Sequence, residues 1–260
     1  MQGQTVIIDY KNSRVQLAVK LKISGNQLLF FIHGLGCAKE NFDGVWTNRN
    51  LKDYSIMVPD LPGFGDSPGL ADFSYDLEDH AGICKSLLDC YPQHTVHVIG
   101  HSMGGAVGLI LGERIPGRLA SFSNVEGNLI GHDCTVSRNK ASVSFEEFEK
   151  RQLPGMILAT AMSAEPGRRL WSVLLKKADT KGLYYSSRSL VTWSDSGVLL
   201  EKFRNISCKK VYIHGDNNSS MPVLRRLEGI PVHSISKSGH FPMNDNPEEF
   251  YKYISDFIKD

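Results

Sequence analysis

The residues best suited to chemistry form the segment Gly100-His101-Ser102-Met103-Gly104, which directly follows the apolar run Val96–Ile99. An apolar strand, a sharp turn and a helix (Ala106–Arg114) in this order are typical of a serine held at the apex of a strained turn, where only small neighbours fit. The helix would direct its N-terminal N–H groups and its positive dipole end toward Ser102. An ordinary glycine-rich turn is the alternative, so a nucleophilic Ser102 requires a base, an acid and an oxyanion donor elsewhere in the chain.

A serine hydroxyl is a weak nucleophile at neutral pH and needs a base within hydrogen-bond reach, itself oriented by a carboxylate. The candidate base is His240, in a predicted loop between the last strand and the last helix. The chain has nine histidines. Those inside predicted strands or helices, such as His97 and His80, are interpreted as packing or surface residues.

Composition excludes several classes of function. The 260 residues are 41% hydrophobic and 22% charged, with a net charge of +1, which indicates a globular protein and gives no electrostatic case for nucleic acid or an anionic membrane surface. Five scattered cysteines without a CxxC pair argue against a disulfide framework or a structural zinc site. No signal peptide and no apolar run of about 18 residues is visible. We therefore expect a cytoplasmic protein that acts on a small molecule, without membrane or nucleic-acid partners; the oligomeric state is left open.

The elements that must position these residues alternate along the chain. An antiparallel hairpin is predicted at Thr5–Asp9 and Val15–Ile23. Further strands are predicted at Leu28–Ile32, Ser55–Val58, Val96–Ile99, Leu119–Val125, Lys210–His214 and Pro231–Ser236. Helices are predicted at Ser74–Cys90, Ala106–Arg114, Val198–Phe203, Met221–Leu227 and Pro247–Ile258. This alternation predicts an α/β fold with a doubly wound, mostly parallel sheet of about eight strands, whose site lies at the carboxyl ends of the strands.

Residues 129–190 break the alternation, because they show helical periodicity and no buried strand. We interpret this segment as a helical lid inserted into a core formed by residues 1–128 and 191–260. Its apolar residues favour a partly apolar substrate, although they can equally pack the lid on the core.

Four motifs resemble those of the α/β-hydrolase fold family over essentially the full chain. They are His33-Gly34 after an early strand, the turn-rich segment 59–67, the serine segment continued by Gly105, and Gly239-His240-Phe241-Pro242. The order of serine before acid before histidine is also that of the family. The resemblance implies that the backbone N–H groups of Met103 and Leu35 form the oxyanion hole.

The acid is the open member of the set. The family pattern Gly-x-x-Asp, counted from Gly215, reaches Asn218, which carries no charge. Asp216 lies two residues early. Glu126, at the end of the preceding predicted strand, is the other position that the resemblance offers. We favour Glu126 and keep Asp216 as the alternative.

The resemblance implies a serine hydrolase of the carboxylesterase type, which cleaves an ester-type bond through an acyl-enzyme on Ser102 with the help of His240 and Glu126. Hydrolysis of thioesters, lactones, amides or carbon–carbon bonds remains open. A small-molecule binding protein with weak or no turnover is the second hypothesis, because the usual acid is absent at Asn218. No metal and no organic cofactor are implied.

Overall fold

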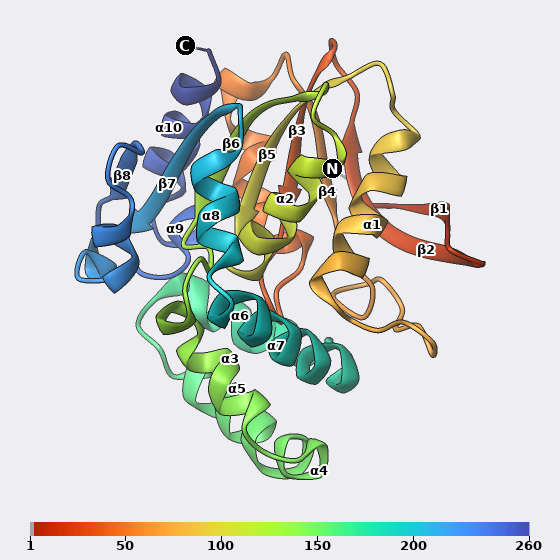
Figure 1. Ribbon diagram of the computed structural model, residues 1–260, viewed down its shortest axis with the longest axis vertical. Coiled ribbons are helices and arrows are strands. Elements are labelled where there is room, and N and C mark those ends of the chain that lie inside the picture. Colours follow the sequence, from red (N-terminus) through yellow and green to blue (C-terminus); the bar gives the residue numbers. More distant parts are fainter. Residues whose placement is uncertain (1–2, 260) are drawn as a thin grey trace.

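The computed structural model describes residues 3–259 and contains an eight-stranded, mostly parallel sheet (Figure 1). The strands are β1 (Gln4–Tyr10), β2 (Ser13–Lys22), β3 (Gln27–Ile32), β4 (Ser55–Pro59), β5 (Thr95–His101), β6 (Leu119–Val125), β7 (Lys209–Gly215) and β8 (Val232–Ile235). Their spatial order is β1-β2-β4-β3-β5-β6-β7-β8. β1 and β2 form the predicted antiparallel hairpin, β2 runs antiparallel to β4, and the remaining pairs are parallel. The predicted fold class is confirmed.

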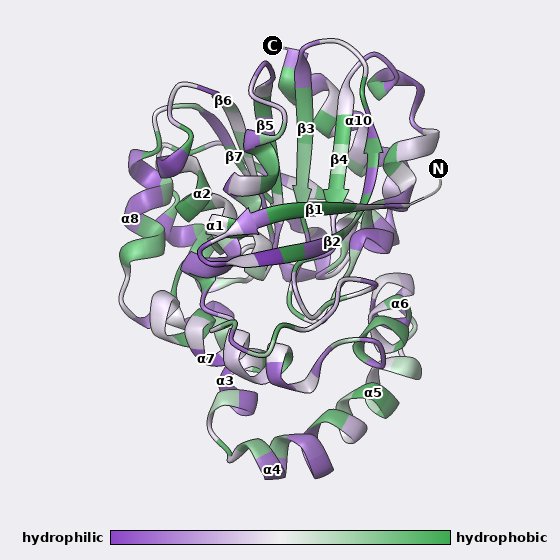
Figure 2. Ribbon diagram, turned by 90° about the vertical axis from the view of Figure 1, so that its right-hand side faces the viewer, coloured by the Kyte–Doolittle hydropathy of each residue, from purple (hydrophilic) through white to green (hydrophobic). Residues whose placement is uncertain are grey.

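The central strands are buried on both faces, which explains their continuous apolar sequences. Leu28 to Ile32 of β3 are all fully buried, and Figure 2 shows most of β3 as hydrophobic. In the hairpin only alternate residues of β2, such as Val15, Leu17 and Val19, enter the core. Burial of every second residue is expected where the core covers only one face of a strand, because successive side chains point to opposite faces.

Helices cover both faces of the sheet, with α1, α2 and α8 on one face and α10 on the other (Figures 1 and 2). The helices of this part of the chain are α1 (Leu77–Asp89), α2 (Met103–Arg114), α8 (Val198–Asn205), α9 (Pro242–Asp245) and α10 (Pro247–Lys259). α1 begins where the Asp76 side chain accepts a hydrogen bond from the Glu78 N–H. The predicted helix at 221–227 is instead a short 3₁₀ helix, Pro222–Arg226, with the proline at its first position.

A separate layer of helices lies beyond the carboxyl ends of the parallel strands (Figures 1 and 2). It consists of α3 (Thr135–Ala141), α4 (Phe145–Glu147), α5 (Leu153–Ala161), α6 (Pro166–Leu175) and α7 (Thr180–Asp195). The boundary expected between residues 190 and 191 falls inside α7. The chain leaves this layer at Gly197, whose left-handed backbone (φ 77°) separates α7 from α8. Among residues 3–259, none of the helices is both long and apolar enough to span a bilayer.

Candidate active site

Ser102 lies at the sharp turn between β5 and α2 and has a strained backbone, with φ 52° and ψ −120°. Such a conformation costs about 1–3 kcal/mol and persists only where the surroundings impose it. A Cβ on Gly104 would collide with the Ile32 carbonyl, and a Cβ on Gly100 would collide with the Gly104 carbonyl. The two glycines therefore allow β5, α2 and the end of β3 to approach closely enough to form the turn.

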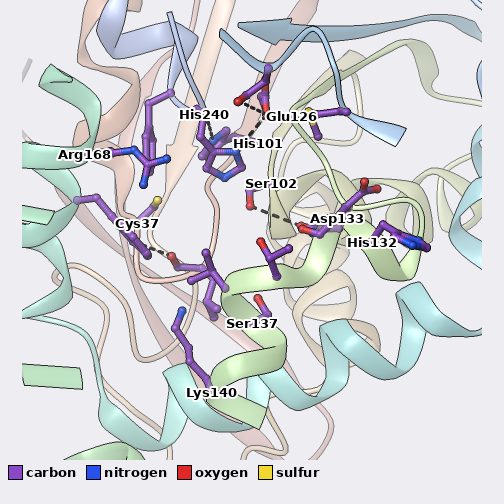
Figure 3. Close-up of a pocket in the computed structure, with 18 of the residues that line it drawn as sticks. Cys37, His101, Ser102, Glu126, His132, Asp133, Ser137, Lys140, Arg168 and His240 are labelled. Atoms are coloured by element: carbon purple, nitrogen blue, oxygen red, sulfur yellow. Dashed lines mark hydrogen bonds and ion pairs between the residues drawn. The ribbon is translucent and has the colours of Figure 1, made fainter. Parts of the chain in front are cut away.

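The hydroxyl of Ser102 points into a pocket of about 290 Å³ that His240 also lines (Figure 3). Among the described residues, this hydroxyl donates a long hydrogen bond of 3.5 Å to Oδ1 of Asn128 rather than to His240. The Nδ2 group of Asn128 in turn donates to the carbonyl of Asp133. A serine hydroxyl rotates easily, and catalytic hydrogen bonds are often long before substrate binds.

Glu126 contacts the imidazole of His240: its Oε2 lies 3.2 Å from Nδ1. The carboxylate is buried, with 1% of the side chain exposed. Its Oε1 accepts a hydrogen bond of 2.8 Å from the Gly215 N–H, and Oε2 accepts one of 3.0 Å from Nδ2 of Asn218. The buried carboxylate thus has donors on both oxygens, which offset the cost of removing it from water.

The backbone of Glu126 is left-handed, with φ 49°, directly after β6 ends at Val125. Its N–H donates to the carbonyl of Ile213 in β7, so the strained residue is held against the neighbouring strand. Ser102 and Glu126 are therefore both non-glycine residues with positive φ at the ends of adjacent strands. Backbone strain of this kind concentrates at functional sites.

Asp216, the alternative acid, has other partners. Its carboxylate accepts hydrogen bonds of 2.9 and 3.0 Å from the backbone N–H groups of Lys237 and Ser238. These bonds hold the pKa of Asp216 below its usual value. Asp216 thus fixes the loop that leads to His240, whereas the side chain that contacts the imidazole is that of Glu126.

The two predicted oxyanion donors belong to segments that adjoin Ser102: a Cβ on Gly34, next to Leu35, would lie 3.0 Å from the Cβ of Ser102, and Met103 follows Ser102 in the chain. Met103 is the first residue of α2, and Leu35 lines the pocket in the loop after β3. No backbone carbonyl among residues 3–259 accepts a hydrogen bond from either N–H group. Two contacts fix the Leu35 loop: the indole N–H of Trp171 donates to the Leu35 carbonyl at 2.9 Å, and Nε2 of His33 accepts from the Leu61 N–H at 3.0 Å.

His101 is a site residue that the sequence reasoning missed. Its Nε2 lies 2.8 Å from the carbonyl of His240, and the two rings lie 4.9 Å apart. Burial lowers the pKa of His101 well below its usual value, so the ring is neutral and donates from Nε2. Its position next to Ser102 in the motif is the only sequence signal for this contact with the His240 loop.

The pocket lies between the carboxyl ends of the strands and the helical layer (Figure 3). Asp133, another pocket residue, has its pKa raised to about 6 by burial, although it accepts hydrogen bonds from the N–H groups of Leu129 and Ile130. Lys140 from α3 and Arg168 from α6 add two cations to the walls. Within residues 3–259, no three His, Cys, Asp or Glu side chains are grouped to hold a metal ion.

Comparison with known proteins identifies the family. The sequence model described as "alpha/beta hydrolase fold" matches residues 27–156, which is half of the chain, and the chain therefore belongs to this family. It is similar to a thermophilic esterase from Thermogutta terrifontis, with a TM-score of 0.81 and 18% identity over 100% of this chain and 98% of the other.

Two curated relatives match a part of the chain. A probable lysophospholipase, BODYGUARD 4 of Arabidopsis thaliana, is 35% identical over 138 residues, which cover 52% of this chain and 31% of the relative. Lipase 1 of Psychrobacter immobilis is 30% identical over 125 residues, covering 42% of this chain and 39% of the relative. The match thus spans well under half of the length of either relative.

Proposed function

We propose that the protein is a serine hydrolase that cleaves an ester bond of a small molecule through an acyl-enzyme on Ser102. The observation that carries this proposal is the contact of 3.2 Å between buried Glu126 and His240 in the pocket that Ser102 lines. The names of the similar proteins, an esterase, a lipase and a probable lysophospholipase, support an ester as the substrate.

In the proposed reaction, Nε2 of His240 takes the proton from the Ser102 hydroxyl as its oxygen attacks the ester carbonyl. Glu126 accepts the Nδ1–H of His240, fixes the tautomer and stabilises the imidazolium. The N–H groups of Leu35 and Met103 stabilise the tetrahedral oxyanion, and a donor of this kind is worth about 10²- to 10³-fold in rate. The imidazolium then protonates the leaving alkoxide, which departs as the alcohol.

Deacylation repeats the same steps with water. His240 takes a proton from a water molecule, which attacks the acyl carbonyl, and returns the proton to Ser102 as the acid is released. We propose that the helices between β6 and β7 form a lid over this reaction, because Trp171 on α6 binds the Leu35 loop and α3 lines the pocket. Thioesters, lactones, amides and carbon–carbon bonds remain alternative substrates of the same machinery.

A binding protein without turnover is the rival proposal. Its support is that position 218 holds an asparagine where the family pattern has an aspartate. The contact of Asn218 with Glu126 weakens that argument, because the amide assists a carboxylate supplied from the neighbouring strand. In the proposed mechanism Glu126 supplies the acid, so none is required at position 218.

A fluorophosphonate probe tests the proposal, because it phosphonylates only an activated serine. We expect stoichiometric labelling of the wild-type protein, detected by intact mass, and none of Ser102→Ala. Ser123→Ala is the matched control, since Ser123 is a buried serine of β6 away from the pocket lining. Absence of labelling in a folded wild-type protein would favour the binding protein.

A further inference from the structure

Lys140 on α3 is a buried cation without a hydrogen-bonding partner. Only 2% of the residue is exposed, and its ammonium group forms no hydrogen bond to any residue between 3 and 259. The residue lines the same pocket as Ser102. Figure 3 shows its side chain extending from α3 toward Cys37, at the end of the pocket away from His240 and Glu126.

The other buried lysine, Lys39, shows how this protein accommodates such a charge. Its ammonium group lies 2.6 Å from Asp60 and 2.7 Å from Asp66, with Glu40 at 3.1 Å. Removing an ammonium group from water costs several kcal/mol unless an opposite charge is supplied. Three carboxylates meet this need at Lys39, and no described carboxylate is bound to Lys140.

The immediate neighbours of Lys140 are not anionic. Its nitrogen lies 5.4 Å from the ring centroid of Trp171, a cation–π contact that offsets only part of the desolvation. Burial raises the pKa of the Cys37 thiol to about 12, so this group is neutral. The pocket carboxylates have other partners: Glu126 binds Gly215, Asn218 and His240, and Asp133 binds the N–H groups of Leu129 and Ile130.

We propose that Lys140 binds a carboxylate of the substrate, so that the hydrolysed ester belongs to a molecule that carries a second, ionised acid group. This inference rests on the proposed function, because it names the substrate class of the same pocket. A carboxylate would supply the opposite charge that the chain supplies at Lys39 and omits at Lys140. The ester carbonyl would lie at Ser102 and the carboxylate at the opposite end of the pocket.

Substrate preference tests the proposal without any variant. The probes are the methyl hemiesters of succinate, glutarate, adipate and suberate, each compared with the neutral dimethyl ester of the same diacid by pH-stat titration. Acetylated hydroxy acids and their methyl esters place the carboxylate on the alcohol side instead. We expect kcat/KM to favour the charged member of at least one pair by about 10- to 100-fold, the range for a hydrogen bond to a charged group.

Lys140→Met removes the charge and keeps the length of the side chain. We expect the hemiester preference, which is the ratio of kcat/KM for the hemiester to kcat/KM for its dimethyl ester, to fall by about 10- to 100-fold. Lys150→Met is the matched control, because Lys150 is an exposed lysine of the same helical layer that pairs with Glu146. An equal loss for both esters in Lys140→Met would show a structural role and overturn the proposal.

We expect the preference for the hemiester over the dimethyl ester to depend on pH. Burial lowers the pKa of Lys140 to about 8, so the ammonium form is lost as pH rises above 8. Among the other groups that line the pocket, Asp133 is already ionised at this pH and Cys37 stays protonated; Arg168 and His132 also line the pocket. We expect the ratio of kcat/KM for the hemiester to kcat/KM for the diester to fall between pH 7 and 9.5. Taking the ratio cancels any pH dependence that the two substrates share.

Binding to Ser102→Ala separates this inference from the proposed function. Calorimetry should show tighter binding of a hemiester than of its dimethyl ester, and the difference should vanish in Ser102→Ala/Lys140→Met. If fluorophosphonate labels Ser102 but neither binding nor turnover prefers a hemiester, the carboxylate proposal is wrong and the hydrolase proposal stands. If hemiesters bind selectively and Ser102 is neither labelled nor active, the hydrolase proposal is wrong instead.

Discussion

The ends of β6 and β7 each carry an acidic residue, and the two carboxylates have different surroundings. Glu126, after β6, is buried and contacts the imidazole of His240. Asp216, after β7, binds the backbone of the loop that carries His240. The strands are adjacent and in parallel register, with Val125 opposite Ile213, so their carboxyl ends lie side by side. The carboxylate that contacts His240 thus comes from the end of β6, and not from the position after β7 that the Gly-x-x-Asp spacing indicates.

The largest effect is expected from Glu126→Gln. The amide can donate to Nδ1 of His240 and so favour the wrong tautomer; in a Ser-His-Asp protease the equivalent change of the acid lowers kcat by about 10⁴-fold. We expect kcat for a p-nitrophenyl ester to fall by about 10³- to 10⁴-fold. Steady-state kinetics check this, and a loss smaller than that of Asp216→Asn would assign the acid to Asp216.

A double variant sharpens the comparison by moving the carboxylate from one strand end to the other. Asn218 already lies 3.0 Å from Oε2 of Glu126, so an aspartate there is close to His240. In Glu126→Gln/Asn218→Asp we expect kcat to be about 10- to 100-fold higher than in Glu126→Gln alone. This recovers only a part of the loss that Glu126→Gln causes. The same assay measures it, with Glu126→Gln/Asn217→Asp as the matched control. No recovery would mean that the end of β7 does not reach the imidazole.

Asn218→Ala should have a moderate effect. It removes one neutral donor from Glu126 and leaves the Gly215 N–H bond. Loss of such a hydrogen bond, at about 1 kcal/mol, corresponds to about a 5-fold decrease in kcat. Asn217→Ala, next to it in the same loop, is the control. A loss as large as that of Glu126→Gln would indicate that Asn218 orients His240 by itself.

Asp216→Asn is expected to change kcat least, by less than about 3-fold, because its role is to hold a loop. Its pKa is depressed in the folded state by the N–H groups of Lys237 and Ser238. Its contribution to stability is therefore present above the unfolded pKa and lost as pH falls through the folded pKa. Urea unfolding should show the variant less stable at pH 7, with the difference shrinking below about pH 4. A difference that grew at low pH would contradict this account.

The sequence was sufficient for the strands and for the order of the site residues, because buried strands have continuous apolar runs and Ser102 lies between a strand and a helix. The sequence did not reveal α7, and the boundary predicted after residue 190 places the last part of this helix in the core. The buried face of this helix contains Ser186, Ser187 and Ser194, and Ser186 lies within hydrogen-bond distance of buried His80. A helix that buries hydroxyl groups lacks the apolar periodicity on which the prediction depended.

Two contacts at the site that the sequence did not reveal join distant segments. Trp171 binds Leu35 across 136 residues, and His101 binds the backbone of His240 across 139. Neither contact has a local pattern, because both arise only when the helical layer and the last loop pack against the sheet. The charge of Lys140 is visible in the sequence, and its burial is not.

The central claim is that the hydroxyl of Ser102 becomes covalently acylated during turnover. Acid quenching during steady-state hydrolysis of a p-nitrophenyl ester, followed by peptide mass spectrometry, tests it most directly. We predict the mass of the acyl group on Ser102, with none on this residue in Ser102→Ala. Continued turnover without an acyl group on Ser102, or with one on another residue, would contradict the account.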